Sequence, residues 1–363
     1  QEELNDQMQI RRDKLAEYEA DGIYPFGQRF VVKDHAKDIK NDFLNYEDQP
    51  VVIAGRLMTM RSHGKTAFAN IRDLSGDIQV YFRKDVLGED NYKYVKMLDI
   101  GDIVGIEGHV FKTHSGEVTI KVDKLTLLSK ALRPLPEKWH GLKDTELRYR
   151  QRYVDLIVNP EVRDTFIKRS KIVAKIREYM MNDGFMEVET PMMHPIPGGA
   201  AARPFITHHN ALDIDIYMRI APELYLKRLI VGGMERVFEM NRCFRNEGID
   251  NRHNPEFTTI ESYQAYGDVE DAIRLTENLV SYCAQEVLGT QEITYQGTEI
   301  NLTPPWNRIT MAEGVKKYTG ENFDAVTTVE EARAIADRLN VEYTNNDGIG
   351  KILNACFEDY VEE

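Results

Sequence analysis

The sequence predicts an α+β multidomain protein, with a five-stranded β-barrel followed by a domain built on an antiparallel β-sheet with helices. A length of 363 residues favours more than one domain. Apolar residues alternate with period two from residue 51 to 128, and a long helical pattern followed by two alternating segments comes later. The expected parts are a helical extension at 1–50, the barrel at 51–130, a linker at 131–145 and the second domain at 146–363.

Composition excludes several classes of protein. The apolar fraction is 42% and the net charge is −14, which argues against a protein that coats nucleic acid non-specifically but leaves room for a local basic surface. Apolar runs are far shorter than the roughly 18 to 20 residues of a membrane span, and no secretory signal begins the residues given. The three cysteines, Cys243, Cys283 and Cys356, are widely spaced, which predicts free thiols and a cytoplasmic location.

Residues 1–24 have a helical pattern that ends at Gly22 and Pro25. This helix is either a solvated charged helix or an arm that contacts RNA. The period then changes to two in five segments separated by turn residues. The segments are VVIAGRLMTMR, TAFANIRDL, DIQVYFRKD, DIVGIEGHVFK and EVTIKVDKLTLL. Because a short amphipathic helix lies between the third and the fourth, the order is that of a small Greek-key barrel of the oligonucleotide-binding (OB) type.

The second domain begins after a linker with two prolines, ALRPLPEKWHG. Residues 163–185 predict a helix with an apolar face, and FMEVETP predicts a strand after it. The apolar face consists of Phe166, Ile172, Val173, Ile176, Tyr179 and Met180. Residues 310–363 read as mainly helical.

Two alternating segments at 235–247 and 256–266 flank a polar loop that contains Arg252 and His253. If they pair as antiparallel strands, one surface receives Arg245, Glu247, Phe257, Glu261 and Tyr263. Arginine binds phosphate or carboxylate with two parallel hydrogen bonds, an aromatic ring can stack on a purine, and a carboxylate beside a phenol suits an ammonium group. Spacing alone equally allows an ordinary hairpin with a charged surface.

At this point the chain resembles a known family. FRNEG followed by RHNPEFT resembles motif 2 of the class II aminoacyl-tRNA synthetases, and GFMEVETPMM resembles motif 1. Residues 195–248 and 131–157 resemble the lysyl-tRNA synthetase family in particular, and the resemblance covers almost the whole chain. It implies activation of L-lysine by ATP to lysyl-adenylate with Mg²⁺, transfer to tRNA(Lys), and a homodimer through the motif 1 region at about 165–190.

The resemblance also implies roles for individual residues. Arg245 would be the catalytic residue, on the α-phosphate of ATP and the lysine carboxylate, and Glu247, His253 and Phe257 would bind the rest of ATP. Gly199 and Glu223 would hold the α-amino group, and Glu261 and Tyr263 would face the side-chain ammonium. GGAAARPF lacks the spacing of a phosphate-binding loop and reads as a mobile loop over the amino acid.

In the barrel, the resemblance implies that Phe68 stacks on an anticodon base while Arg61, Gln79 and Glu117 bind base edges. Without the family, Phe68 could equally be a core residue.

The chain departs from the family at its end, because no glycine-rich stretch with the arginine of motif 3 is present; GIGKIL has a lysine instead. We therefore expect a C-terminally incomplete chain that is inactive by itself and supplies no metal ligands. Two alternatives remain open: an aspartyl- or asparaginyl-type synthetase, and a non-catalytic RNA-binding fragment or paralogue.

Overall fold

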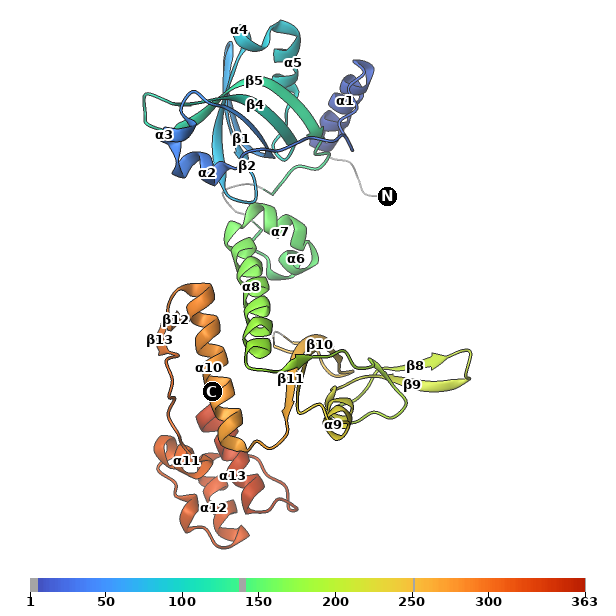
Figure 1. Cartoon of the computed structure of the whole chain (residues 1–363), viewed down its shortest axis with the longest axis vertical. Helices are drawn as coiled ribbons and strands as arrows, with labels where there is room; N and C mark the ends of the chain where they lie inside the picture. The colour runs from blue at the N-terminus through green and yellow to red at the C-terminus, as the bar shows by residue number, and fades with distance from the viewer. Residues whose placement is uncertain (1–5, 137–141, 251, 363) are drawn as a thin grey trace. The chain divides into compact units, whose positions relative to one another are not determined.

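The computed structural model describes residues 6–136, 142–250 and 252–362, and these form two compact units, Gln1–Asp164 and Thr165–Glu363. The division falls within the long helix α8 (Pro160–Asn182). No helix in these ranges is long and apolar enough to cross a membrane. The predicted fold class, a five-stranded barrel followed by an antiparallel sheet with helices, is confirmed (Figure 1).

The first unit contains a closed barrel with the strand order β1-β2-β3-β5-β4. In β2 and β3 every second residue is buried, so one side of each strand fills the barrel and the other faces outward. The helix that the sequence predicts between β3 and β4 is α5 (Glu89–Met97), and a further short helix, α4 (Lys84–Leu87), precedes it. The strands are β1 (Pro50–His63), β2 (Thr66–Arg72), β3 (Asp77–Arg83), β4 (Ile103–Lys112) and β5 (Val118–Ser129).

The predicted N-terminal helix is α1 (Asp6–Ala20), and it packs on the barrel instead of standing free. Its Tyr18 is 1% exposed within the barrel core. The segment that follows also covers the barrel, because a Cβ on Gly105 of β4 would lie 2.5 Å from the ring of Phe30. Two short helices, α2 (Ala36–Asn41) and α3 (Phe43–Tyr46), follow this segment and lie on the side of the barrel opposite α1 (Figure 1).

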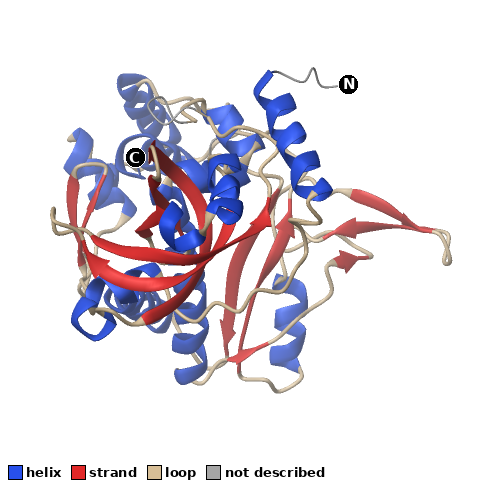
Figure 2. Cartoon of the chain, turned by 90° about the horizontal axis from the view of Figure 1, so that it is seen from above, coloured by secondary structure: helices blue, strands red, loops and turns tan. Residues whose placement is uncertain are grey.

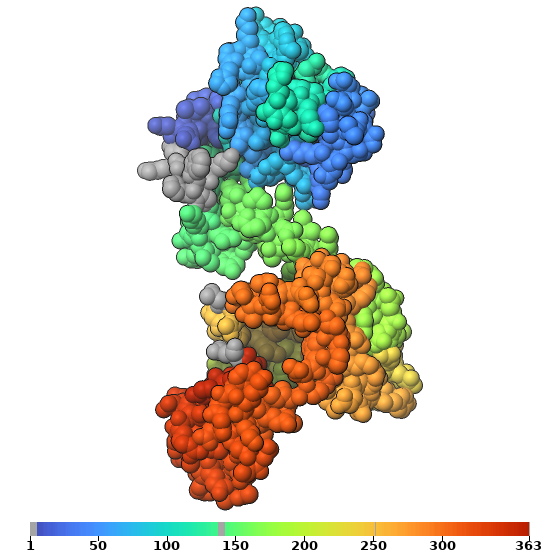
Figure 3. All heavy atoms as spheres, turned by 90° about the vertical axis from the view of Figure 1, so that its left-hand side faces the viewer, coloured from blue at the N-terminus to red at the C-terminus, as the bar shows by residue number. Residues whose placement is uncertain are grey.

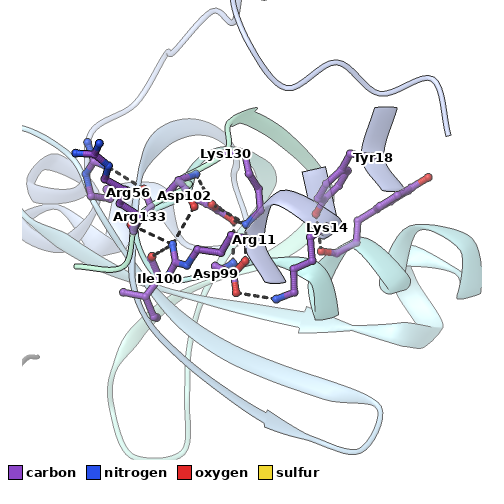
Figure 4. Close-up of polar contacts among 12 residues, drawn as sticks. Arg11, Lys14, Tyr18, Arg56, Asp99, Ile100, Asp102, Lys130 and Arg133 are labelled. Carbon is purple, nitrogen blue, oxygen red and sulfur yellow. Dashed lines mark hydrogen bonds and ion pairs between the residues drawn. The ribbon is translucent and has the colours of Figure 1, made fainter. Parts of the chain in front are cut away.

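A buried polar cluster, formed by Arg11, Lys14, Asp99, Asp102 and Lys130, ties α1 and the end of β5 to the barrel (Figure 4). We call it the Lys130 cluster. The Lys130 ammonium, which is fully buried, donates to Asp99 at 2.6 Å and to Asp102 at 2.8 Å. Arg11 donates to the carbonyl of Ala131 at 2.9 Å. Burial alone would raise the pKa of Asp99, but hydrogen bonds from Lys130 and Lys14 outweigh it and leave that pKa lowered.

Helices α6 (Thr145–Arg150) and α7 (Arg152–Val158) precede α8, which begins with proline at its first position. In the second unit, a sheet with the order β11-β10-β6 forms the centre. Its strands are β6 (Met186–Glu187), β10 (Arg236–Phe244) and β11 (Glu256–Gln264). The strand predicted for FMEVETP is thus only two residues long, because β6 pairs with β10 at Val237 and Phe238 alone.

A second sheet has the order β7-β9-β8, and its β8 and β9 form a hairpin that extends away from β10 and β11 (Figures 1 and 2). The sequence analysis did not predict this hairpin. Helix α9 follows directly after β9 and contacts both β10 and β11. The elements are β7 (Met193–His194), β8 (Ile206–His209), β9 (Ile214–Met218) and α9 (Glu223–Val231).

The C-terminal part is mainly helical, as predicted, with its own small core around Val315, Ile335 and Ile352. In Figure 3 its atoms form a compact group in orange and red. Capping boxes at Asp268, Thr310 and Thr328 begin three of the helices. The elements are α10 (Val269–Leu288), β12 (Glu292–Tyr295), β13 (Thr298–Asn301), α11 (Met311–Thr319), the 3₁₀ turn Phe323–Ala325, α12 (Val329–Leu339), α13 (Ile349–Phe357) and the π-helical turn Glu358–Glu362.

Candidate active site and nucleic-acid interface

The β10–β11 hairpin brings the predicted residues of the second domain onto one face. Its antiparallel register pairs Cys243 with Phe257, Glu239 with Glu261, and Val237 with Tyr263. Since these positions are all odd-numbered, they lie on the same side of the sheet. Arg245 continues this side beyond the end of β10, where its backbone N–H donates to the Pro255 carbonyl at 2.9 Å.

Arg245 lies beside an aromatic ring and has unmet capacity for hydrogen bonding. Its guanidinium carbon lies 5.2 Å from the centre of the Phe257 ring. Its Nε is buried and has no hydrogen-bond partner in the described part of the chain. Because a buried N–H group without an acceptor is costly, the arrangement favours an anion at this position.

The loop between the strands is organised around Asp250. This carboxylate accepts the backbone N–H groups of Arg252 and His253, each at 2.7 Å, and contacts the His253 Nδ1 at 2.7 Å. The hydrogen bond from His253, followed by the two backbone N–H groups, lowers the pKa of Asp250 to about 2. Asp250 therefore fixes the direction in which the His253 ring points.

Glu247 connects this loop to the segment at 198–205. Its carboxylate accepts the backbone N–H of Arg203 at 3.2 Å, and the N–H of Asn246 donates to the Arg203 carbonyl at 2.8 Å. The four residues predicted for ATP line one cavity of about 530 Å³ together with neighbouring loop residues. The lining is Arg245, Glu247, Gly248, Ile249, Asp250, Arg252, His253, Asn254 and Phe257.

Apart from Arg245, the residues predicted for lysine form a second group that does not line this cavity. Gly199 has a φ of +88°, and a Cβ there would lie 3.0 Å from the Glu223 Cβ, so only glycine fits beside this glutamate. Glu223 is paired with Lys227 at 2.6 Å, one turn further along α9. The Lys227 ammonium in turn lies 5.8 Å from the centre of the Tyr263 ring.

Glu261 and Tyr263 lie next to each other, and the pKa values of both groups are raised. Burial, and then the negative charge of Glu223, raise the pKa of Glu261. Burial, and then the charge of Glu261, raise the pKa of Tyr263, whose hydroxyl donates to Glu261 at 3.4 Å. Besides burial, the neighbouring carboxylates Glu223 and Glu261 contribute to these shifts, and a cation would offset their negative charge.

A buried ion pair beneath the same face escaped the sequence analysis. Arg219, at 1% exposure, donates to Glu239 at 2.7 Å, and Glu239 also accepts from the Thr190 hydroxyl at 2.6 Å. The alternation of β10 places Glu239 on the same face as the site residues, and this was the only sequence pattern that pointed to Glu239. Its partner Arg219 lies twenty residues earlier, and no local pattern links the two.

In the barrel, Phe68 points outward and is not part of the core. It is half-buried and stacks on Tyr81, with ring centres 4.3 Å apart. Together with Arg61 and Gln79 it lines an open cavity of about 610 Å³, completed by residues of the β4–β5 turn. The Gln79 side-chain carbonyl accepts from the Thr119 hydroxyl at 2.8 Å.

Glu117, the fourth residue predicted for the anticodon, does not line this cavity in the structure. It lies directly before β5 and pairs with Lys40 of α2 at 3.1 Å. Within the described ranges, no three His, Cys, Asp or Glu side chains gather in a way that could hold a metal ion.

A closed five-stranded barrel followed by this sheet and its motif 2 hairpin defines a class II aminoacyl-tRNA synthetase with an OB-fold domain. Residues 144–349 match the family "tRNA synthetases class II (D, K and N)", and residues 51–128 match "OB-fold nucleic acid binding domain". A lysine–tRNA ligase of Thermoanaerobacter pseudethanolicus is 57% identical over 363 residues, 100% of this chain and 73% of that protein.

A lysine–tRNA ligase of Carboxydothermus hydrogenoformans is 57% identical over 99% of this chain and 74% of that protein. One of Oceanobacillus iheyensis is 55% identical over 100% of this chain and 75% of that protein. The chain therefore belongs to the lysine–tRNA ligase family. This confirms the resemblance and the enzyme class predicted from the sequence. The aspartyl- or asparaginyl-type enzyme and the non-catalytic paralogue are not favoured.

Proposed function

We propose that the two groups on the β10–β11 face bind the two small substrates of lysine activation, ATP and L-lysine. The observation that carries this proposal is the contrast between them. One group presents an arginine whose buried Nε has no acceptor, beside an aromatic ring, and the other presents the neighbouring carboxylates Glu223 and Glu261. Such a face suits an anion at one end and a cation at the other.

For ATP, Arg245 would bind the α-phosphate and the lysine carboxylate, where charge develops as the carboxylate attacks phosphorus. Phe257 would stack on adenine, and Glu247 and His253 would contact the adenine and triphosphate end. The hydrogen bond between the His253 ring and the Asp250 carboxylate supports this role for His253, because it holds the ring at the cavity. Mg²⁺ is the expected counter-ion of ATP, and we assign it no ligand among the described residues.

For lysine, the Gly199 carbonyl and Glu223 would hold the α-amino group, while Glu261 and Tyr263 would face the side-chain ammonium. Close packing of Gly199 against Glu223 supports their joint role. Glu223 is engaged by Lys227, so a bound α-amino group would share this carboxylate or replace the lysine.

The activity test is ATP–pyrophosphate exchange by the complete enzyme, which lysine should stimulate and aspartate and asparagine should not. Glu261→Gln should raise the KM for lysine because it removes a negative charge from the proposed pocket. Glu256→Gln, on the opposite face of the same strand, is the matched control and should leave the KM unchanged. Exchange that depends on aspartate or asparagine would contradict the proposal.

In the barrel, we propose that Phe68 stacks on a base of the tRNA(Lys) anticodon and that Arg61, Gln79 and Glu117 bind base edges. Support comes from the outward position of Phe68 and its shared cavity with Arg61 and Gln79. Glu117 would have to release Lys40 to reach a base.

Phe68→Ala should weaken binding of the lysine anticodon stem-loop by about 1 to 3 kcal/mol, the scale of one base–ring stacking interaction. Lysine-dependent exchange should not change, because it uses the other unit. Leu44→Ala removes an 84% exposed side chain from α3 and is the control. A folded Phe68→Ala protein, with an unchanged melting temperature, that binds the stem-loop like the wild type would rule out this role.

We further propose a homodimer through the motif 1 region, since Ile167 and Ile172 of α8 are 37% and 38% exposed.

A cytoplasmic location fits the three cysteines, which are all buried free thiols.

A further inference from the structure

A basic pocket of about 380 Å³ lies in the first unit, outside the cavity proposed for the anticodon bases. Four cations and one carboxylate line it, in a chain whose net charge is −14. The lining residues are Lys37, Lys40, Asn41, Arg72, Ser75, Gly76, Asp77, Pro160 and Arg163, and we call this the α2 pocket.

The α2 pocket is a built feature held by hydrogen bonds among three chain segments. Asp73, in the β2–β3 turn, accepts the backbone N–H of Ala36 at the start of α2 at 2.9 Å. Arg163, in the first turn of α8, donates to the Asp73 carbonyl at 3.0 Å. The backbone N–H of Lys37 donates to the Ser75 hydroxyl at 3.0 Å. These contacts fix the positions from which the cations project.

The positive charge of the pocket is only partly compensated. Asp77 is bound by Arg72, with an Nη2–Oδ2 distance of 2.8 Å, and Lys40 is paired with Glu117. Lys37 is exposed, and its ammonium has no hydrogen bond or ion pair within the described ranges. The pocket therefore presents a net positive surface that suits phosphate groups.

The pocket and the anticodon cavity share one face of the β2–β3 hairpin. Phe68 and Arg72 both point outward from β2, four residues apart, which is about 13 Å along a strand. Gln79 and Asp77 are the corresponding outward residues of β3. One end of this face thus carries groups that suit bases, and the other end carries groups that suit the charged backbone.

We propose that the α2 pocket binds phosphates of the tRNA strand next to the anticodon and so positions the anticodon bases in the cavity of Phe68. This inference rests on the proposed tRNA-binding function of the barrel. Contacts to phosphate carry no sequence information, so the pocket contributes affinity and register while the Phe68 cavity contributes specificity. Lys40 of the pocket is paired with Glu117, one of the residues proposed for the anticodon bases.

The test compares wild type, Lys37→Gln and Lys37→Glu of the complete enzyme for binding of the lysine anticodon stem-loop and a stem-loop with another anticodon, at several salt concentrations. Lys37→Gln should raise the Kd of both RNAs by the same factor and reduce the slope of log Kd against log salt by about one. Lys37→Glu should raise both Kd values further. Lys124→Gln, on an exposed barrel lysine outside both cavities, should change neither quantity.

Four results would overturn the inference. An unchanged Kd and salt slope in Lys37→Gln, while Phe68→Ala weakens binding, would leave the anticodon proposal intact and remove the α2 pocket. Weakening of the lysine stem-loop alone would assign Lys37 to base recognition. Inorganic tripolyphosphate that binds wild type but not Lys37→Gln, with RNA binding unaffected, would identify a small polyphosphate as the ligand. A wild-type enzyme that binds neither stem-loop would refute the anticodon proposal and this inference together.

Discussion

Replacement of Arg245 by alanine should lower kcat/KM for lysine-dependent ATP–pyrophosphate exchange by about 10²- to 10³-fold, the scale of losing one preorganised charge-stabilising donor. The guanidinium is buried at Nε, has no acceptor of its own among the described residues, and lies over the Phe257 ring at the proposed ATP cavity. A donor held in place before substrate arrives costs no reorganisation during the reaction, so its removal affects the transition state directly.

Arg242→Ala is the matched control for this experiment. Arg242 lies on β10, three residues before Arg245. Its side chain is 49% exposed and pairs with Glu256 at 3.5 Å. Its substitution removes an equal charge from the opposite face of the sheet, so exchange should remain close to that of the wild type. Equal activity of Arg245→Ala and Arg242→Ala would remove Arg245 from the chemistry.

Asp102→Ala should destabilise the barrel by about 3 to 5 kcal/mol, the cost of breaking a buried ion pair by removing one partner. Asp102 and Lys130 both have fully buried side chains, 2.8 Å apart. Asp102 also accepts the backbone N–H groups of Asp99 and Ala131, each at 2.8 Å, and the alanine variant would leave both without this acceptor. Native-state hydrogen exchange of amides in β4 and β5 measures the loss within this unit.

Glu107→Ala provides the comparison for Asp102→Ala. Glu107 of β4 pairs with Lys124 of β5 at 2.9 Å, but these two side chains are 40% and 66% exposed. Exposed pairs contribute only about 0 to 1 kcal/mol, so the amide protection should hardly change. Similar losses in the two variants would show that burial does not govern the strength of the Lys130 cluster.

Several elements could be predicted from the sequence because their signal is local. The alternation of β2 and β3 reports which side of each strand is buried, and that side fills the barrel. The same reasoning placed Arg245 and Glu261 on one face of the β10–β11 hairpin, since residues paired across two antiparallel strands point to the same side of the sheet. The family resemblance then supplied roles that spacing alone left open.

Other features depend on contacts between distant residues. The strand predicted for FMEVETP is only the two-residue β6 in the structure, because only two of its residues pair with β10. Arg219, directly after β9, pairs with Glu239 of β10 in a buried hydrogen-bond network that no sequence periodicity predicts.

The sequence by itself determined the order of the two domains, the strand faces and the family, because these follow from short-range pattern and from motifs read along the chain. Only the tertiary structure decided that Phe68 lies outside the core, that Lys37 and Arg163 meet around one turn, and that Lys130 is buried between two carboxylates. Each of these depends on chain segments far apart in sequence packing together, and the cost of burying or pairing a charge is set by that packing.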